Sequence, residues 1–376
     1  MQEIINAIDG LNVKNNETVL IMLAEQQLPE ISNLIFELNS REIDFVGGIF
    51  PGLIYGSEKH CTGAIVRALP VIQRPVLVQG VINECGKNFE CLFDPFRSLS
   101  KKSATAFIIL DGVSSNIASF LSPMFNLLAD SVEYIGCGAG FVDVEARPCI
   151  FTPEGFFKDA AVITFLDMQC MLGVHHGWKK AIGPIVVTKS DGNLVKQLNW
   201  KNAFEVYKEA IEPDLGKSIK DFSFYDISSH YPFGIYKEND EDLLREVLKV
   251  TSKGELFCAG DVPENAVLNI MKGEKLSLIN SAGKALDDCF LKDDINVEYC
   301  LVIDCIGRAL FLQEEFEEEL MAIVNGLEVR NIHTVPEGVL SLGEIASMGG
   351  DMVEFLSKTI VVGIFHELPG TVHRCL

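Results

Sequence analysis

The sequence lacks the segments by which proteins cross a membrane or enter the secretory pathway. None of its uncharged apolar stretches approaches the roughly 18 residues that a membrane-spanning helix needs. The opening residues, MQEIINAID, have neither the basic region nor the apolar core of a signal peptide. We therefore expect a cytoplasmic protein without membrane insertion.

The sequence is also poor in basic residues. It has 31 lysines and arginines against 53 aspartates and glutamates, which gives a formal net charge of -22. Such a charge repels the phosphate backbone of nucleic acids, so we expect no nucleic-acid partner. The acidic residues gather at 238–242 and 314–319, where we predict solvated faces.

Several motifs of metal sites and enzymes are missing. The 11 cysteines are odd in number and form no CxxC pair, which favours reduced thiols over disulfides or a structural zinc site. The chain has no HExxH motif, no P-loop and no Ser-His-Asp order. GCGAG at 136–140 lacks the GxGxxG spacing, and close backbone packing explains its glycines better than a dinucleotide. We predict that the protein is not an enzyme.

A repeated unit is the strongest pattern that is present. It consists of an apolar β-rich run, a helix with apolar residues at helical spacing, a glycine-containing strand and a further apolar strand. In the third unit the helix carries five glutamates, at 314, 315, 317, 318 and 319, which we expect on its outer face. The strands of the three units are 19–24, 45–54 and 64–69; 105–112, 134–142 and 160–166; and 299–308, 337–347 and 358–365.

A second repeat pairs residues 184–198 with 245–260. Each has two β-rich runs around a turn that contains glycine, which predicts a hairpin. Because both patterns recur on either side of the polar segment 212–221, we expect two related halves. The fold class is then α/β, and each half is a mixed β-sheet with helices packed on it.

VHHGWKKAIGP, residues 174–184, is the first candidate site. His175 and His176 would point to opposite faces of a strand, so only one of them can face a ligand. Gly177 lets the backbone kink, and Trp178 offers an aromatic wall with one N–H donor. His176 suits either a ligand contact or a histidine satisfied in the core.

DCIGR, residues 304–308, is the second candidate. It lies where an apolar strand ends and a helix begins, a common place for ligands in α/β sheets. Cys305 suits a reactive thiolate and Arg308 suits a partner for a carboxylate or phosphate. The alternative is a small buried thiol and a surface arginine.

Several stretches resemble, in order, the signatures of the FIST (F-box and intracellular signal transduction) family. They are 174–209, GDVPENAVLNIM at 260–271, DCIGRALFLQEEFEEEL at 304–320, LGEIAS at 342–347 and EFLSKTIVVGIF at 354–365. The resemblance covers almost the whole chain. It places the family motifs on His176, Gly177 and Trp178, on Cys305, Gly307 and Arg308, and on Gly343, Glu344 and Ile345.

The resemblance implies two domains and a sensory role. A lead-in over 1–18 would precede a FIST N-terminal domain at 19–215 and a FIST C-terminal domain at 216–366, with a tail at 367–376. Relatives are described as small-molecule sensors that work with histidine kinases or other signalling proteins, and some as haem-dependent nitric-oxide sensors. One branch carries an F-box, for which the lead-in is too short.

The expected function is therefore binding of a small molecule between the two halves, with a separate partner giving the output. The expected contacts are His176, Gly177, Trp178, Cys305, Gly307, Arg308, Gly343 and Glu344, and His176 would ligate a haem or metal if one is bound. The alternatives are a haem-dependent gas sensor, an interaction scaffold without a ligand and a thiol enzyme using Cys305.

Overall fold

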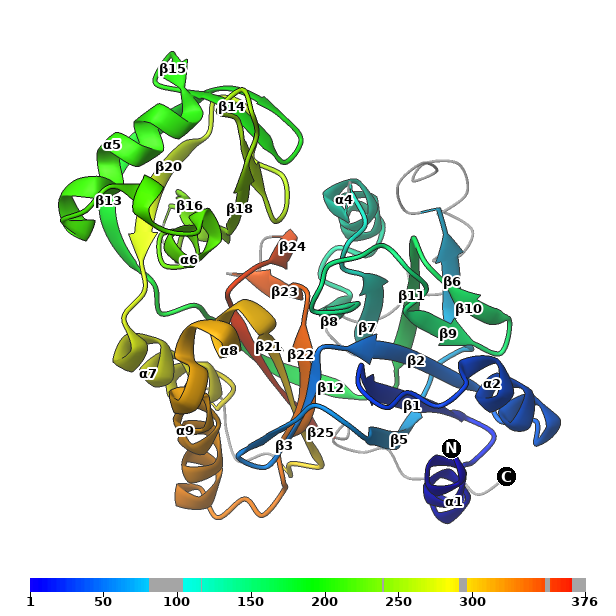
Figure 1. The fold of residues 1–376 in the computed structure, drawn as a ribbon. Coiled ribbons are helices and arrows are strands. Elements are labelled where there is room, and N and C mark those ends of the chain that lie inside the picture. Colours follow the sequence, from blue (N-terminus) through cyan, green and yellow to red (C-terminus); the bar gives the residue numbers. More distant parts are fainter. Residues whose placement is uncertain (81–103, 116, 239, 291–295, 349–351, 367–376) are drawn as a thin grey trace.

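A computed structural model describes residues 1–80, 104–115, 117–238, 240–290, 296–348 and 352–366. Figure 1 shows a large body and a smaller domain that projects from it. The smaller part, residues 179–272, is called the inserted domain here because the chain enters and leaves it through two paired strands, β13 (Lys179–Asp191) and β20 (Val267–Lys272). Among the described residues, no helix has the length and apolarity to cross a membrane.

The repeated unit is confirmed, and its three copies form the body. In each copy two parallel strands are joined through helical structure, and a third strand lies antiparallel beside the first. The copies are β1 (Glu17–Ala24), α2 (Ile31–Ser40), β2 (Phe45–Phe50) and β5 (Ala64–Pro70); β7 (Ala104–Asp111), α4 (Ile117–Leu128), β8 (Val132–Ala139) and β11 (Ala160–Leu166); and β21 (Tyr299–Cys305), α8 (Ile306–Leu312), α9 (Phe316–Val329), β22 (Glu337–Ser341) and β25 (Ile360–His366). Their apolar runs are buried, as a two-sided sheet requires.

The three copies exchange strands in a cycle. After its second parallel strand, each copy sends one strand into the sheet of another copy. Thus β3 (Gly52–Tyr55) pairs with β22, β9 (Ile150–Thr152) pairs with β2, and β23 (Glu344–Met348) pairs with β8. The exchange ties the beginning of the chain to its end, because β3 and β22 lie in the same sheet.

Close backbone packing inside the body explains the glycines of 136–140. A Cβ atom on Gly136 would lie 2.3 Å from the carbonyl oxygen of Ile108, and one on Gly138 would lie 2.9 Å from that of Leu342. Atoms at these distances overlap, so neither position accepts a side chain without a shift of the backbone. The interpretation of GCGAG as a packing motif is confirmed.

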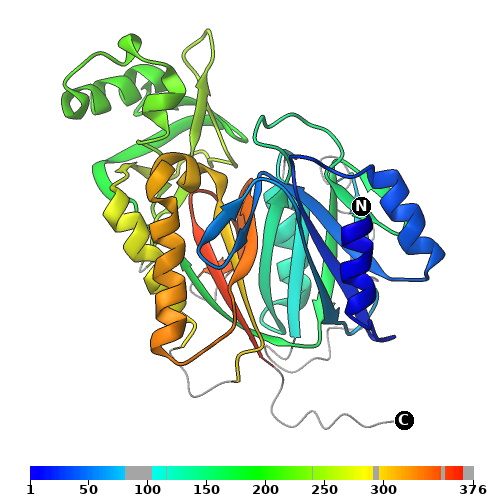
Figure 2. The same ribbon diagram turned by 60° about the horizontal axis from the view of Figure 1, so that its bottom comes forward.

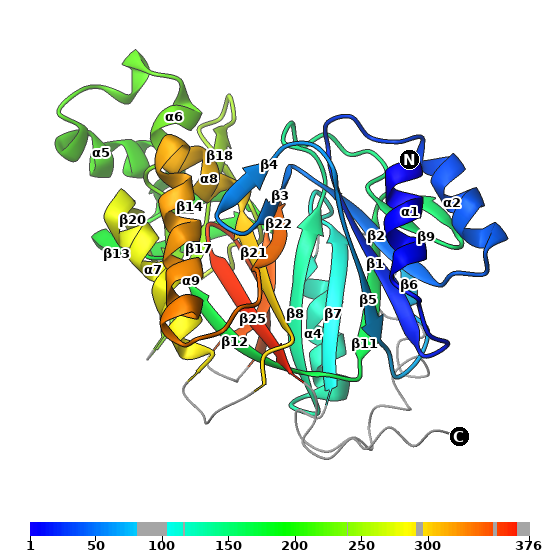
Figure 3. The ribbon, with the colours of Figure 1, turned by 90° about the horizontal axis from the view of Figure 1, so that it is seen from below.

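Further strands extend the three sheets and helices cover them. Figures 2 and 3 show α7 and α9 side by side against the sheet that contains β21 and β25. The additional elements of the body are α1 (Gln2–Gly10), β4 (Glu58–His60), β6 (Val76–Gln79), β10 (Gly155–Phe157), β12 (Gln169–His175), α7 (Lys275–Asp288), η3 (Gln313–Glu315) and β24 (Met352–Leu356).

The inserted domain contains both predicted hairpins. β13 and β14 form the first and β18 and β19 the second, and pairing of β14 with β19 joins them in one sheet. The boundary segment 212–221 runs from the last turn of α5 into η2. The remaining elements are β14 (Leu194–Leu198), β15 (Lys201–Asn202), α5 (Ala203–Leu215), η2 (Ile219–Asp221), α6 (Phe224–Ser228), β16 (Phe233–Ile235), β17 (Leu243–Arg245), β18 (Val247–Val250) and β19 (Leu256–Cys258). The α/β class with mixed sheets is therefore confirmed.

The expectation that all five glutamates of the third unit face outward is wrong for Glu319. The helix is interrupted at Gln313, where φ is 55°, and a new helix starts at Phe316. Glu319 comes three residues after Phe316, so it lies on the same face as that buried ring and is fully buried itself. It meets Arg308 there in an ion pair.

Candidate functional site

The two candidate motifs meet in a packed interior. Arg308 is fully buried, and its guanidinium donates to the backbone carbonyl of His176. Its Nε lies 3.2 Å from a carboxylate oxygen of Asp304, and a second ion pair joins it to Glu319. Further acceptors are the carbonyls of Leu278 and Lys358, each at 3.2 Å, and Ser281 Oγ at 3.1 Å.

These contacts leave Arg308 no role at a surface. Its two carboxylate partners and four oxygen acceptors surround the guanidinium, so the group holds the strand end at 304 against the segment before the inserted domain. Such a buried network is stable only when all members are present, because a lone buried charge is costly. The structure assigns Arg308 to the connection between the motifs.

His176, Gly177 and Trp178 form the kink that their sequence predicts. The Trp178 amide donates to His176 Nδ1 at 2.8 Å, across Gly177, whose φ is 74°. A Cβ atom on Gly177 would lie 2.7 Å from the Ser277 carbonyl oxygen, so only glycine fits. The Trp178 ring packs on Phe311 with centroids 4.9 Å apart. The kink directs the chain out of β12 and into β13.

The surroundings of His176 do not fit an axial haem ligand. Its ring is 4% exposed, Nδ1 accepts the Trp178 amide, and Nε2 lies 3.5 Å from a carboxylate oxygen of Glu241. Burial lowers the pKa of His176 and favours the neutral ring. Within the described residues, no group of three or more His, Cys, Asp or Glu side chains is arranged to hold a metal ion.

The neighbouring His175 has two acidic partners. Nδ1 lies 3.0 Å from Glu241 and Nε2 lies 2.8 Å from Asp288. The hydrogen bond with Glu241 raises the pKa of His175 although burial opposes the shift. Burial alone would raise the pKa of Glu241, yet its contacts with His175 and His176 together lower this pKa to about 2. The His175 imidazole thus bridges the strand before the inserted domain, that domain and α7, and the raised pKa favours its protonated form.

A cavity of about 760 Å³ lies beside this packed interior. Its walls come from the N-terminal end of α4, from β18 and β19 of the inserted domain, and from β24 and the start of α8. We call it the inter-domain cavity. Of the expected contacts, Cys305 and Gly343 line it, whereas His176, Gly177, Trp178, Gly307, Arg308 and Glu344 do not.

Buried ionisable groups form the floor of the inter-domain cavity near Cys305. Burial raises the pKa of Cys305 well above its usual value, so the thiol stays protonated and is a poor nucleophile. Lys358 Nζ lies 2.7 Å from the Glu246 carboxylate. A Cβ atom on Gly307 would lie 3.2 Å from both of these groups, so the glycine gives the ion pair room.

Glu344 lies directly behind Cys305. It is fully buried; Ser341 Oγ donates to Oε1 at 2.5 Å and the Thr359 amide donates to Oε2 at 3.3 Å. Burial raises the pKa of Glu344 to about 8, because the charged form loses more solvation than these two donors restore. The carboxyl is therefore protonated at neutral pH.

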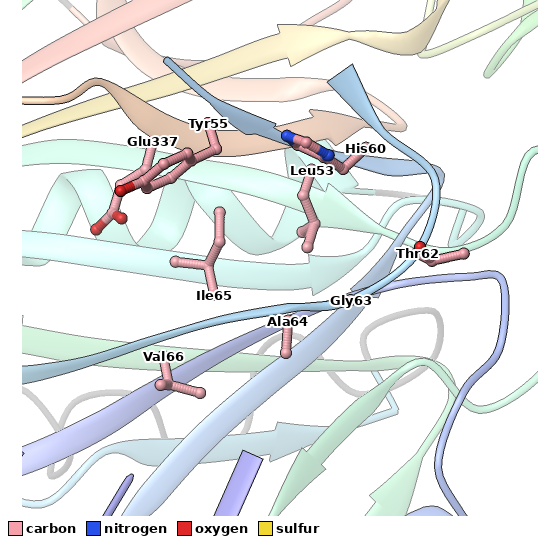
Figure 4. A pocket seen from close by; sticks show the side chains of 9 residues that line it. All are labelled: Leu53, Tyr55, His60, Thr62, Gly63, Ala64, Ile65, Val66 and Glu337. Atoms are coloured by element: carbon pink, nitrogen blue, oxygen red, sulfur yellow. The ribbon is translucent and has the colours of Figure 1, made fainter. Parts of the chain in front are cut away.

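A smaller pocket of about 330 Å³ opens elsewhere on the body. In Figure 4, Tyr55, His60 and Glu337 lie on one side of it, and Ala64 and Val66 lie on the strand that faces them. The Glu337 carboxylate is already 2.6 Å from Arg67, a cation on that same strand. This pocket contains none of the expected contacts, and the inter-domain cavity is the better candidate site.

Most residues that line the inter-domain cavity were not predicted from the sequence. Arg245 ends β17 and Glu246 lies between β17 and β18. Their charges interrupt an otherwise apolar run, and this was a usable signal because charged residues are seldom buried without a partner. Lys358, a charged residue just before the apolar run of β25, gave a similar signal. The residues from α4 gave none, since Ile117 and Leu121 lie on the apolar face that packs in the core and Ala118 is an ordinary exposed residue.

Comparison with family models identifies the protein class. The FIST N domain matches residues 18–201 and the FIST C domain matches residues 203–347. These matches cover most of the chain, so it belongs to the FIST family, whose domains are associated with signal transduction. A comparison with curated proteins finds no match. The inter-domain cavity takes its walls from both matched regions, with α4 from the first and β18, β19 and α8 from the second.

Proposed function

We propose that this FIST protein is a cytoplasmic sensor that binds a small molecule in the inter-domain cavity and signals through a separate partner. A histidine kinase is one candidate partner. The observation that carries the proposal is the cavity itself: its volume of about 760 Å³ falls in the range of small-molecule sites. Its walls combine apolar side chains with a few polar groups, as such sites do.

The position of the cavity supports a sensory role. The inserted domain joins the body through β13 and β20, and polar contacts beside the cavity add to this connection. Ser357 Oγ donates to the Leu244 carbonyl at 2.9 Å, and Lys237 Nζ lies 2.7 Å from Glu354. A ligand that touches the inserted domain and the body would favour one relative orientation of the two, and a partner can read that orientation.

The test compares two tryptophan variants of α4. Ala118 and Ser119 are both exposed neighbours, but only Ala118 lines the inter-domain cavity. Ala118→Trp should therefore fill the cavity, while Ser119→Trp adds the same ring outside it. Thermal-shift screening of the wild-type protein against small metabolites, followed by calorimetry, identifies ligands.

The expected result is that ligands bind the wild-type and Ser119→Trp proteins alike and lose at least tenfold in affinity for Ala118→Trp, about the loss when one good contact is blocked. Ligands that bind both tryptophan variants equally well would locate the binding site elsewhere and contradict the proposal.

A further inference from the structure

Arg245 is a buried cation in the wall of the inter-domain cavity. It ends β17 and is only 5% exposed. Nε donates to the Asp261 carbonyl at 2.8 Å, and Nη1 donates to the carbonyls of Leu244 at 2.9 Å and Phe355 at 3.1 Å. Gly260 lets the backbone lie against it, since a Cβ there would be 2.9 Å from Nε. In the described part of the chain, Nη2 has no hydrogen-bond acceptor, so its two N–H groups remain for an occupant.

Arg245 differs in its charge balance from the other buried cations nearby. Arg308 has Asp304 and Glu319, and Lys358 has Glu246. For Arg245, by contrast, no carboxylate oxygen of the described residues lies within the 4.0 Å of an ion pair. Burial lowers the pKa of Arg245, which reflects the solvation that its charge has lost. An anion in the cavity would offset that loss.

The acidic side chains of the cavity are mostly neutralised by other groups. Glu246 pairs with Lys358, Glu354 pairs with Lys237, and Asp143 pairs with Arg147 at 2.8 Å. Asp261 is the exception among the described residues. The carboxylates of Glu354 and, more weakly, Asp261 act on Arg245 from beyond ion-pair distance.

Two further features favour a negative charge in the cavity. Lys249, whose Nζ lies 4.6 Å from the Phe257 ring centroid, adds a second cation, and both residues line the cavity. The N-terminal end of α4 also borders it, and a helix N-terminus favours an anion. Four carboxylates of the lining stand beside these two cations, and three of the four have a cation partner of their own.

The rest of the lining is suited to an apolar body. Its large hydrophobic side chains include Ile117, Leu121, Leu248, Phe257, Leu310 and Leu342. We infer that the inter-domain cavity binds an organic monocarboxylate with an apolar body, whose carboxylate accepts a hydrogen bond from Arg245 Nη2. This inference rests on the proposed function. The two free N–H groups belong to one nitrogen, which suits a singly charged carboxylate better than a phosphate dianion, because a dianion is usually held by donors from several groups.

The experiment uses three probes of equal chain length and different head charge: octanoate, octanamide and octylammonium. Calorimetric titration of the full chain at about 0.15 M salt, where exposed charges are screened beyond about 8 Å, isolates the local contribution. Octanoate should bind about tenfold or more tightly than octanamide, the scale of one charge-assisted hydrogen bond. Octylammonium should bind most weakly.

Two variants locate the effect at Arg245. Arg245→Met should bring the affinity for octanoate down to that for octanamide. The control Lys180→Met removes a charge from an exposed position outside the cavity lining and should leave the affinities for octanoate and octanamide unchanged. Asp261→Asn removes a carboxylate that acts on the guanidinium and has no ion-pair partner among the described residues, and it should tighten octanoate binding severalfold. The Asp261→Asn variant keeps the test decisive if Arg245→Met fails to fold.

The outcomes separate the two proposals. Equal affinity for octanoate and octanamide in the wild-type protein, or no binding of octanoate, would overturn the inference. The same holds if Asp261→Asn leaves octanoate binding unchanged. A neutral or cationic ligand from the metabolite screen that loses affinity in Ala118→Trp would overturn the inference while leaving the proposed function intact. Ligands indifferent to Ala118→Trp would end both.

Discussion

Replacing Glu344 by glutamine should change how the stability of the protein depends on pH. The buried carboxyl has a pKa raised from 4.5 to about 8. The folded state therefore keeps its proton up to about pH 8, whereas the unfolded state releases it near 4.5. Between these values the folded state binds more protons, so the free energy of unfolding falls as the pH rises. Glutamine, which is neutral and of similar shape, removes this dependence.

The magnitude follows from the two pKa values. A shift of one unit corresponds to about 1.4 kcal/mol, so the rise from 4.5 to about 8 sets an upper limit of about 5 kcal/mol. At pH 5 the wild-type and Glu344→Gln proteins should have similar free energies of unfolding. At pH 9 the variant should be more stable by a few kcal/mol, within that limit.

Urea denaturation between pH 5 and pH 9, followed by circular dichroism, measures the difference. Asp304 and Glu319 are also buried and titrate in both proteins, so only the difference between the two curves is informative. Glu318→Gln, at an exposed position of α9, removes the same charge from the surface and controls for the change in net charge. Wild-type and Glu344→Gln curves that run parallel across this range would refute the reasoning.

Three further predictions concern packing and charge. Gly173→Ala should cost about 3 kcal/mol of stability, because its Cβ would lie 1.6 Å from the Ala285 carbonyl oxygen. The control Gly283→Ala, in open space on α7, should cost nothing. Equal shifts of the melting temperature in the two variants would contradict this prediction. His175→Gln should cost about 1 kcal/mol of stability below pH 6.5, and this cost should shrink as the pH rises through the raised pKa of His175. Urea unfolding from pH 5 to pH 9 measures it. A difference in the free energy of unfolding that stays constant over this range would argue against the bridge from His175 to Glu241 and Asp288. Iodoacetamide should label exposed Cys61 well before buried Cys305, and faster labelling of Cys305, read by peptide mass spectrometry, would revive the thiol-enzyme alternative.

The local elements and their repetition could be predicted from the amino-acid sequence. Apolar runs with helical or strand periodicity are local, and they predicted the three units and both hairpins. The kink at His176–Trp178 was likewise predictable, because Gly177 is the only residue there that adopts a positive φ without strain. The resemblance to the FIST family also follows from ordered local motifs.

The way in which these elements combine could not be predicted from the sequence and is visible in the folded chain. The cyclic exchange of β3, β9 and β23 pairs strands that are far apart in the sequence, and pairing partners are not encoded in periodicity. The same holds for Arg308: its sequence neighbours allowed a ligand contact, but Glu319 and the His176 carbonyl use its hydrogen bonds in the folded chain. Arg245 became a candidate anchor because folding buries it at the cavity without a carboxylate partner among the described residues. Whether a buried charge is compensated depends on which groups lie next to it in the folded chain, and these neighbours cannot be predicted from the order of residues.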